Sequence, residues 1–86
     1  MKIKLEKFGK MLLSRPAGHD AYLTAKAYIL PHKQEPITLD FSGVEVFTPS
    51  WADEFITPLQ KHFPNKIRFI NTQNTSVKAT LEILKS

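Results

Sequence analysis

The residues that could do chemistry gather in one short stretch, LDFSGVEVFTPSWADEF, which covers residues 39–55. Its second half holds a hydroxyl at Ser50, an indole at Trp51 and two neighbouring carboxylates at Asp53 and Glu54. A serine in this setting could act as a nucleophile, accept a phosphate group or cap a helix. The three roles place different demands on the rest of the chain, so each can be weighed against the sequence.

Nucleophilic catalysis finds no support elsewhere in the chain. A serine nucleophile needs a histidine base, and no spacing pattern links any of the three histidines to Ser50 or to a zinc site. The chain has no cysteine, and its three glycines lie too far apart to form a phosphate-binding loop. Asp53 and Glu54 are consecutive, so on a helix they diverge by about 100° and make a poor catalytic pair. We therefore expect a non-catalytic protein without a metal site.

The position of Ser50 predicts a helix cap. An apolar stripe at helical spacing follows it, formed by Trp51, Phe55, Leu59 and Phe63. We interpret Ser50 as the N-cap, with Asp53 three residues later completing a capping box. Pro58 interrupts the helical pattern and predicts a kink or a restart, because proline removes a backbone hydrogen bond.

A serine at a helix N-terminus is also well placed for phosphorylation. A phosphate there would face free backbone N–H groups and the positive end of the helix. It would add a charge of about −1.5 to −2, enough to reject a partner that tolerates a hydroxyl. Asp53 and Glu54 would oppose this charge, and Arg15 could pair with the phosphate if its loop lies nearby.

Two neighbouring residues have structural interpretations. Trp51 begins the apolar stripe, which favours packing in the core, and an exposed anchor for a partner is the alternative. Asp40 follows a strand of apolar residues, so we interpret it as a structural acid that accepts hydrogen bonds from loop N–H groups.

The elements that must position these residues alternate between strands and helices. Period-two alternation and short apolar runs predict strands over residues 2–8, 11–13, 37–41 and 66–70. Helical spacing and capping signals predict helices from Ser14-Arg15-Pro16 to Pro31, from Ser50 to Phe63 and over residues 77–84. We expect one α/β domain over residues 1–86, with a small, mixed but mostly parallel sheet of about four strands and about three helices packed against it. The first strand is expected at an antiparallel edge.

Strand-to-helix connections emerge at the carboxyl edge of a parallel sheet, where ligands and partners bind. Here the connections are residues 14–16, 41–50 and 71–75. We expect all three to meet at one edge.

Charge and hydropathy limit the classes of partner. The net charge is +4, and its excess lies in the first 33 residues, where seven basic residues face two acids. These basic residues are spread singly, which is typical of a solvated surface and also suits an acidic partner. Nucleic-acid binding would require a cluster of basic residues with aromatic residues among them, and the sequence has no such cluster. No apolar stretch approaches the ~20 residues of a membrane span, and the N-terminus lacks a signal-peptide core, so we expect a cytoplasmic protein.

The chain resembles a known family in several places. The similarity rests on Gly9 with residues 12–15, on the run from Leu39 to Val44, and on Ser50 with residues 52–54. This pattern is similar to the STAS-like family of unassigned function, which is related to the STAS domains of bacterial anti-sigma-factor antagonists. The resemblance extends over most of the chain and implies a small sheet with helices packed against it and no cofactor.

In those antagonists, a kinase-type anti-sigma factor phosphorylates a serine at the strand-to-helix junction and binds the unmodified form. By this resemblance Ser50 takes the place of that serine. Thr48, Pro49 and Trp51 replace the usual aspartate, first serine and glycine around it. STAS-like relatives also tend to occur with GHKL-type ATPase domains, which implies a partner of that class.

These observations predict a non-catalytic regulatory domain that docks a protein partner through residues 48–54 and Arg15, with phosphorylation of Ser50 as the candidate control. The alternative is a sensor that binds a small anion or nucleotide at the same helix N-terminus. The sequence leaves the partner and the oligomeric state open.

Overall fold

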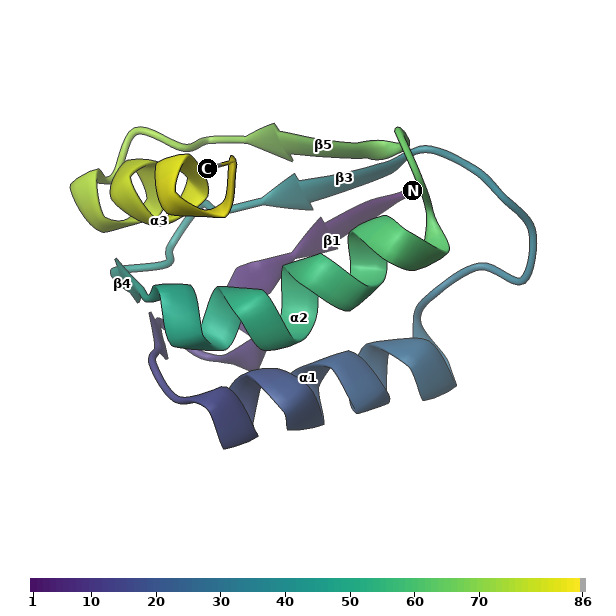
Figure 1. Ribbon diagram of the computed structural model, residues 1–86, viewed down its shortest axis with the longest axis horizontal. Helices are drawn as coiled ribbons and strands as arrows, with labels where there is room; N and C mark the ends of the chain where they lie inside the picture. Colours follow the sequence, from purple (N-terminus) through teal and green to yellow (C-terminus); the bar gives the residue numbers. More distant parts are fainter. Residues whose placement is uncertain (86) are drawn as a thin grey trace.

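Short strands alternate with longer helices along the chain, and the computed structural model describes residues 1–85 of it (Figure 1). In chain order the elements are β1 (Lys2–Lys4), the 3-10 helix η1 (Leu5–Phe8), β2 (Met11–Leu12), α1 (Arg15–Tyr28), β3 (Ile37–Asp40), β4 (Val46–Phe47), α2 (Pro49–His62), β5 (Ile67–Ile70) and α3 (Thr75–Lys85). The predicted α/β class is confirmed.

All strand pairs are parallel. The main sheet has the order β1-β3-β5, and β2 pairs with β4 in a separate two-stranded sheet. The prediction of a mostly parallel sheet is therefore confirmed, although the strands divide between two small sheets. The prediction of an antiparallel first strand is wrong, because the short turn at Gly9 leads into the second sheet and β1 pairs with β3 instead.

The predicted strand over residues 2–8 ends after Lys4. Side chains three positions apart face opposite sides of a strand, yet Leu5 and Phe8 both turn toward the core. Leu5 is fully buried, and the Phe8 ring centroid lies 6.2 Å from that of Trp51. A 3-10 turn places both side chains on one side, since residues three apart are superposed along its axis.

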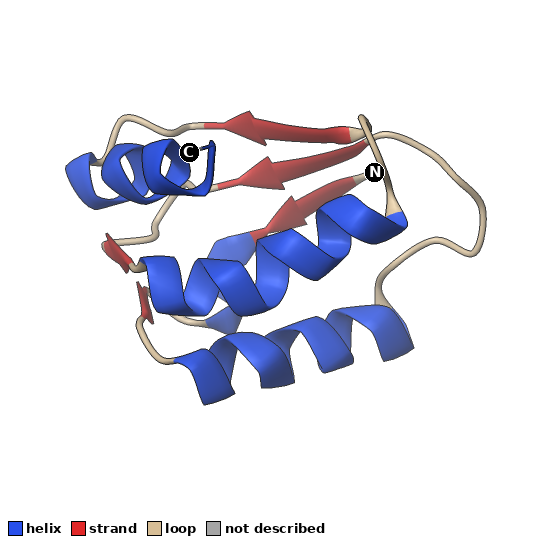
Figure 2. Ribbon diagram, in the orientation of Figure 1, coloured by secondary structure: helices blue, strands red, loops and turns tan. Residues whose placement is uncertain are grey.

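The strand order places the helices on one side of the main sheet. The chain leaves β1, returns through α1 to β3, leaves again and returns through α2 to β5. Both connections step in the same direction across the sheet, so right-handed crossovers put α1 and α2 on the same face. Ile3, Leu39 and Phe69 are in register on the face that the helices cover. Figure 2 shows α2 lying across β1, with α1 beside α2.

The apolar stripe of α2 forms the centre of the core. Its members Trp51, Phe55, Leu59 and Phe63 are each at most 1% exposed, as the spacing predicted. The helix continues through Pro58, so of the predicted kink or restart the restart does not occur. Pro58 removes one hydrogen bond, but Phe55 and Leu59 are buried on either side of it and hold the two halves of the helix in place.

The first long helix begins as predicted. Ser14 is its N-cap, and the Ser14 side chain accepts a hydrogen bond from the backbone N–H of Ala17 at 3.2 Å. Its buried side is narrow: Ala21 and Ala25 face the core, whereas Tyr28 is 86% exposed. The small residues on this side let α1 approach α2 closely.

Candidate functional site

The three strand-to-helix connections meet at one edge of the molecule, as predicted. The backbone N–H of Thr48, at the start of α2, donates to the carbonyl of Leu12, just before α1, at 3.1 Å. The side-chain amide of Asn74, at the start of α3, donates to the carbonyl of Glu45 at 2.9 Å. Hydrogen bonds therefore join the starts of all three α-helices.

The cap of α2 is Thr48 and not Ser50. The Thr48 hydroxyl accepts a hydrogen bond from the backbone N–H of Trp51 at 3.2 Å, and Pro49 occupies the first helical position. Ser50 is therefore the second residue of the helix, and the predicted capping box with Asp53 is wrong because a box from Thr48 would close at the third helical residue, which is Trp51. The preference of proline for the first helical position is the signal that identifies Thr48.

Ser50 shares one face of α2 with the two acids. Asp53 and Glu54 follow it by three and four residues, the spacing at which helical side chains are neighbours. The side chain is partly exposed, and its hydroxyl makes no hydrogen bond within residues 1–85. The hydroxyl is therefore free of any capping role.

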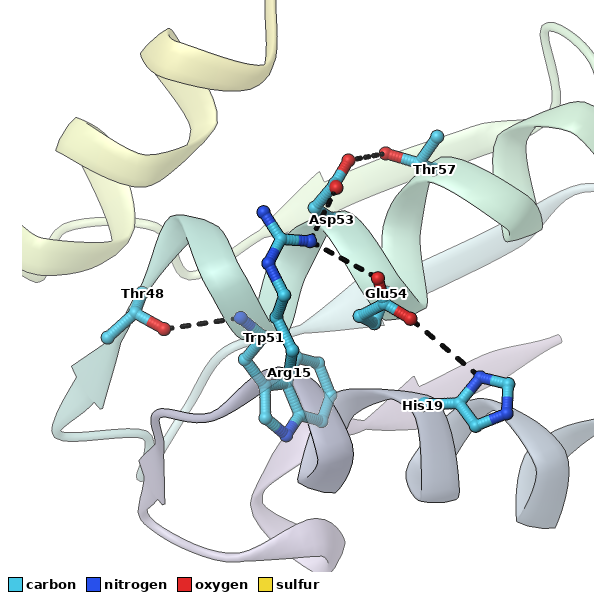
Figure 3. A network of polar contacts seen from close by, with 7 residues as sticks. All are labelled: Arg15, His19, Thr48, Trp51, Asp53, Glu54 and Thr57. Atoms are coloured by element: carbon cyan, nitrogen blue, oxygen red, sulfur yellow. Dashed lines mark hydrogen bonds and ion pairs between the residues drawn. The ribbon is translucent and has the colours of Figure 1, made fainter.

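Arg15 from the first turn of α1 binds both acids of α2 (Figure 3). Its Nη1 lies 2.8 Å from Asp53 Oδ2 and 3.2 Å from Glu54 Oε2. The carboxylates were predicted to diverge, but the guanidinium lies where both can reach it. His19 Nδ1 is 3.8 Å from Glu54 Oε1, and the Thr57 hydroxyl donates to Asp53 Oδ1 at 3.0 Å. All of these residues are at least partly exposed.

The network changes the protonation equilibria of its members. The hydrogen bond from Arg15 lowers the pKa of Asp53, and the bond from Thr57 adds to this effect. The same carboxylates of Asp53 and Glu54 raise the pKa of Arg15. The site therefore holds fixed opposite charges at neutral pH. Sequence reasoning placed Arg15 at this edge but did not identify His19 or Thr57 as part of the network.

Trp51 belongs to the core. Its side chain is 1% exposed, and its ring is stacked on that of Phe55 with centroids 4.9 Å apart. The packing interpretation is confirmed, and the indole is not exposed as a partner anchor would be. The Trp51 backbone carbonyl also lies against Gly18 of α1, so the two helices are in close contact near their N-termini.

Asp40 has the structural role predicted for it. The side chain is buried, and its Oδ1 accepts hydrogen bonds from the backbone N–H and the hydroxyl of Ser42 and from the amide of Asn71. Lys2 Nζ lies 3.4 Å from Oδ2. The bond from Asn71, together with those from Ser42, holds the pKa of Asp40 well below its usual range. This carboxylate ties the carboxyl ends of β3 and β5 together.

An open groove of about 500 Å³ extends from the Arg15 network along the seam between α1 and α2. It is lined by His19, Tyr22, Leu23, Lys26, Asp53, Glu54, Thr57 and Pro58. A second hollow, of about 450 Å³, lies away from these charges where Ile56, Phe69 and Leu81 face one another between α2, β5 and α3.

Within residues 1–85, no group of three or more histidine, aspartate or glutamate side chains is arranged to hold a metal ion. No helix in that part is both long enough and apolar enough to cross a membrane.

Comparison with known families identifies the domain. The family described as a STAS-like domain of unknown function (DUF4325) matches residues 25–77. The chain belongs to this STAS-like family. The match includes the whole of α2 with Ser50, Asp53 and Glu54, whereas Arg15 and His19 lie before it. Neither the curated proteins nor the solved structures contain a significant match to the chain.

Proposed function

We propose that this STAS-like domain is a non-catalytic regulatory module that docks a protein partner through one exposed surface. This junction surface is formed by Arg15, Ser50, Asp53 and Glu54 at the N-terminal turns of α1 and α2. The observation that supports it best is the double contact of Arg15 with the two acids, because it arranges opposite charges on an exposed face.

Side chains that are held before binding lose less conformational freedom on binding. Arg15 carries two contacts from α2, and Asp53 is held a second time by Thr57. When a partner that complements this charge pattern binds, little conformational entropy is lost in ordering the side chains at the centre of the junction surface. The alternation of one cation with two anions also favours some partners over others, since like charges repel.

The groove beside the junction surface adds an apolar component. Leu23 is 47% exposed within it, and Tyr22 lines the same wall. Binding surfaces commonly combine apolar contacts at the centre with charged residues around them. The combination suits a protein partner better than a small anion, which would meet the carboxylates of Asp53 and Glu54 at this helix end.

Ser50 is the proposed control point of the junction surface. Its hydroxyl is uncommitted, and its helix position is near the free N–H groups of the first turn. A phosphate there would compete with Asp53 and Glu54 for Arg15 and would add about −1.5 to −2 charge beside them. A partner that binds the unmodified surface would be released. The family resemblance makes a GHKL-type ATPase with kinase activity the proposed partner.

Quantitative affinity capture from the native host tests this proposal. The baits are the wild-type domain, Asp53→Lys in the junction surface, and Asp20→Lys as a control with the same charge change at an exposed site on α1. We expect a GHKL-type ATPase that is captured equally by wild type and control and about tenfold less by Asp53→Lys. Equal capture of every protein by Asp53→Lys and wild type would contradict docking at this surface.

Two further baits separate docking from its control. Ser50→Ala should capture the ATPase as wild type does, and Ser50→Glu should lose it because the new carboxylate repels the same partner. If Ser50→Glu binds normally while Asp53→Lys does not, the surface docks the partner but phosphorylation does not gate it.

A further inference from the structure

The main sheet has a face that no helix within residues 1–85 covers. Strands β1, β3 and β5 are in register in two rows on this face, Lys2–Thr38–Arg68 and Lys4–Asp40–Ile70. These six residues form the outer sheet face. Lys2, Lys4 and Arg68 are exposed, and Thr38 and Ile70 are partly exposed. The face lies opposite Ile3, Leu39 and Phe69, which pack against the helices.

An uncovered face is unusual for a parallel sheet. Parallel sheets occur almost only where both faces are covered. Here the one-directional strand order directs α1 and α2 to the same side and leaves the outer sheet face to solvent. Four of its six side chains are charged and Ile70 is its only large apolar residue, so a partner that covers this face must carry complementary charges.

The charge on the outer sheet face is positive and largely unpaired. Its single acid, Asp40, is 2% exposed and already bound by Lys2, Ser42 and Asn71. Lys4 and Arg68 make no ion pair within residues 1–85. Two cations therefore remain available at opposite edges of the sheet, which is about 10 Å wide between its outer strands.

We propose that the outer sheet face binds an acidic polypeptide segment of another protein, laid across the three strands. Carboxylates of this segment pair with Lys4 and Arg68. Its backbone and apolar side chains contact Thr38 on the central strand and Ile70, which lies beside Arg68 on β5. The face has no aromatic residue on which a base could stack, and its small area holds few phosphate contacts, which disfavours nucleic acid. The proposal does not depend on the junction surface, which lies at another part of the fold.

The test uses a fluorescent ten-residue poly-glutamate peptide and a single-stranded ten-nucleotide DNA of mixed sequence as probes. Binding to the 15N-labelled protein is followed by NMR and fluorescence anisotropy at two salt concentrations. The variant Lys4→Glu/Arg68→Glu is compared with Lys33→Glu/Lys78→Glu, which changes the same charge at exposed residues of a loop and of α3. Lys2 is left unchanged because it contacts Asp40.

We expect the peptide to shift the amide resonances of β1, β3 and β5 and to bind the first variant about tenfold more weakly, with less than a twofold change in the control. Lys4→Ala/Arg68→Ala provides the milder substitution if charge reversal impairs folding. Equal losses in the two charge-reversal variants would show unspecific attraction and would overturn the proposal. Tighter binding of the DNA than of the peptide at this face would overturn it in favour of nucleic acid.

Discussion

Gly18 of α1 lies directly against the backbone carbonyl of Trp51 in α2. A Cβ added at Gly18 would lie 2.5 Å from the Trp51 carbonyl oxygen, which is closer than such atoms can approach. The contact sets the distance between α1 and α2 at the end where Arg15 reaches its two acids. The junction surface therefore depends on the absence of a side chain at this position.

The substitution Gly18→Ala should destabilise the domain although alanine favours helices. Overpacking costs about 1–3 kcal/mol, and the gain in helix propensity returns only about 1 kcal/mol. We expect a net loss of up to about 2 kcal/mol in the free energy of unfolding, measured by urea denaturation. Thr24→Ala, at an exposed site of the same helix, is the control and should change the free energy little. A Gly18→Ala variant more stable than wild type would show that the helices do not meet as described.

The cap of α2 can be tested by comparing two hydroxyl deletions. Thr48→Ala should lower the free energy of unfolding by about 1 kcal/mol, because it leaves the N–H of Trp51 without its acceptor. Ser50→Ala should change it by no more than about 0.5 kcal/mol. Thr48→Ser keeps the hydroxyl and should retain most of the stability. The reverse order of effects in thermal or urea unfolding would restore Ser50 as the cap.

Asp40 should make the stability depend on pH in the acid range. Its pKa is lower in the folded state than the value of about 3.9 expected in the unfolded chain. The stabilisation is therefore complete above about pH 4 and is lost as the pH falls toward the folded-state pKa. At pH 7, Asp40→Asn should lower the free energy of unfolding by about 2 kcal/mol, since it removes the charge that accepts three hydrogen bonds.

Urea unfolding of wild type and Asp40→Asn at pH 7, 4 and 3 measures this difference. The gap between the two proteins should narrow below pH 4, because Asp40 of unfolded wild type then takes up a proton that the folded protein does not bind, and this stabilises the unfolded state of wild type. Asp20→Asn is the control and should follow wild type at neutral pH. A gap that stays constant down to pH 3 would mean that Asp40 is not the acid responsible.

The Arg15 network should be visible in the titration of one carboxylate. The contact with Arg15 is the main cause of the lowered pKa of Asp53, so Arg15→Met should raise that pKa toward the ordinary value. The side-chain carboxyl resonance of Asp53, followed by NMR against pH, reports the change directly. Lys26→Met removes a cation farther along the groove and should leave the titration nearly unchanged. An Asp53 titration that is the same in Arg15→Met and wild type would contradict the pairing.

Much of the fold follows from local patterns in the sequence. The spacing of apolar residues alone predicts the stripe from Trp51 to Phe63 and the strands around residues 37–40 and 67–70. The meeting of the connections at one edge follows from parallel pairing. These features depend on residues near one another in the chain, which is why they could be predicted.

The errors arose where distant contacts decide the local structure. The turn at Leu5 forms because Phe8 packs against residues more than 40 positions away in sequence. The pairing of β1 with β3 depends on α1, which carries the chain back so that β3 can lie parallel to β1. The short turn after Phe8 gives no indication of this pairing. The cap was misplaced for a different reason, since the proline after Thr48 was a local signal that the interpretation did not use. The contact of both Asp53 and Glu54 with one guanidinium could not be predicted, because it depends on where α1 lies relative to α2.

Docking at the junction surface is tested most directly by hydrogen–deuterium exchange of the domain with and without a partner that affinity capture identifies, read by mass spectrometry. We expect slower exchange on binding in peptides that cover residues 15–23 and 48–57, and no such effect when the domain carries Asp53→Lys. Slower exchange confined to other peptides, with these two unchanged by a bound partner, would show that the junction surface is not where the partner docks.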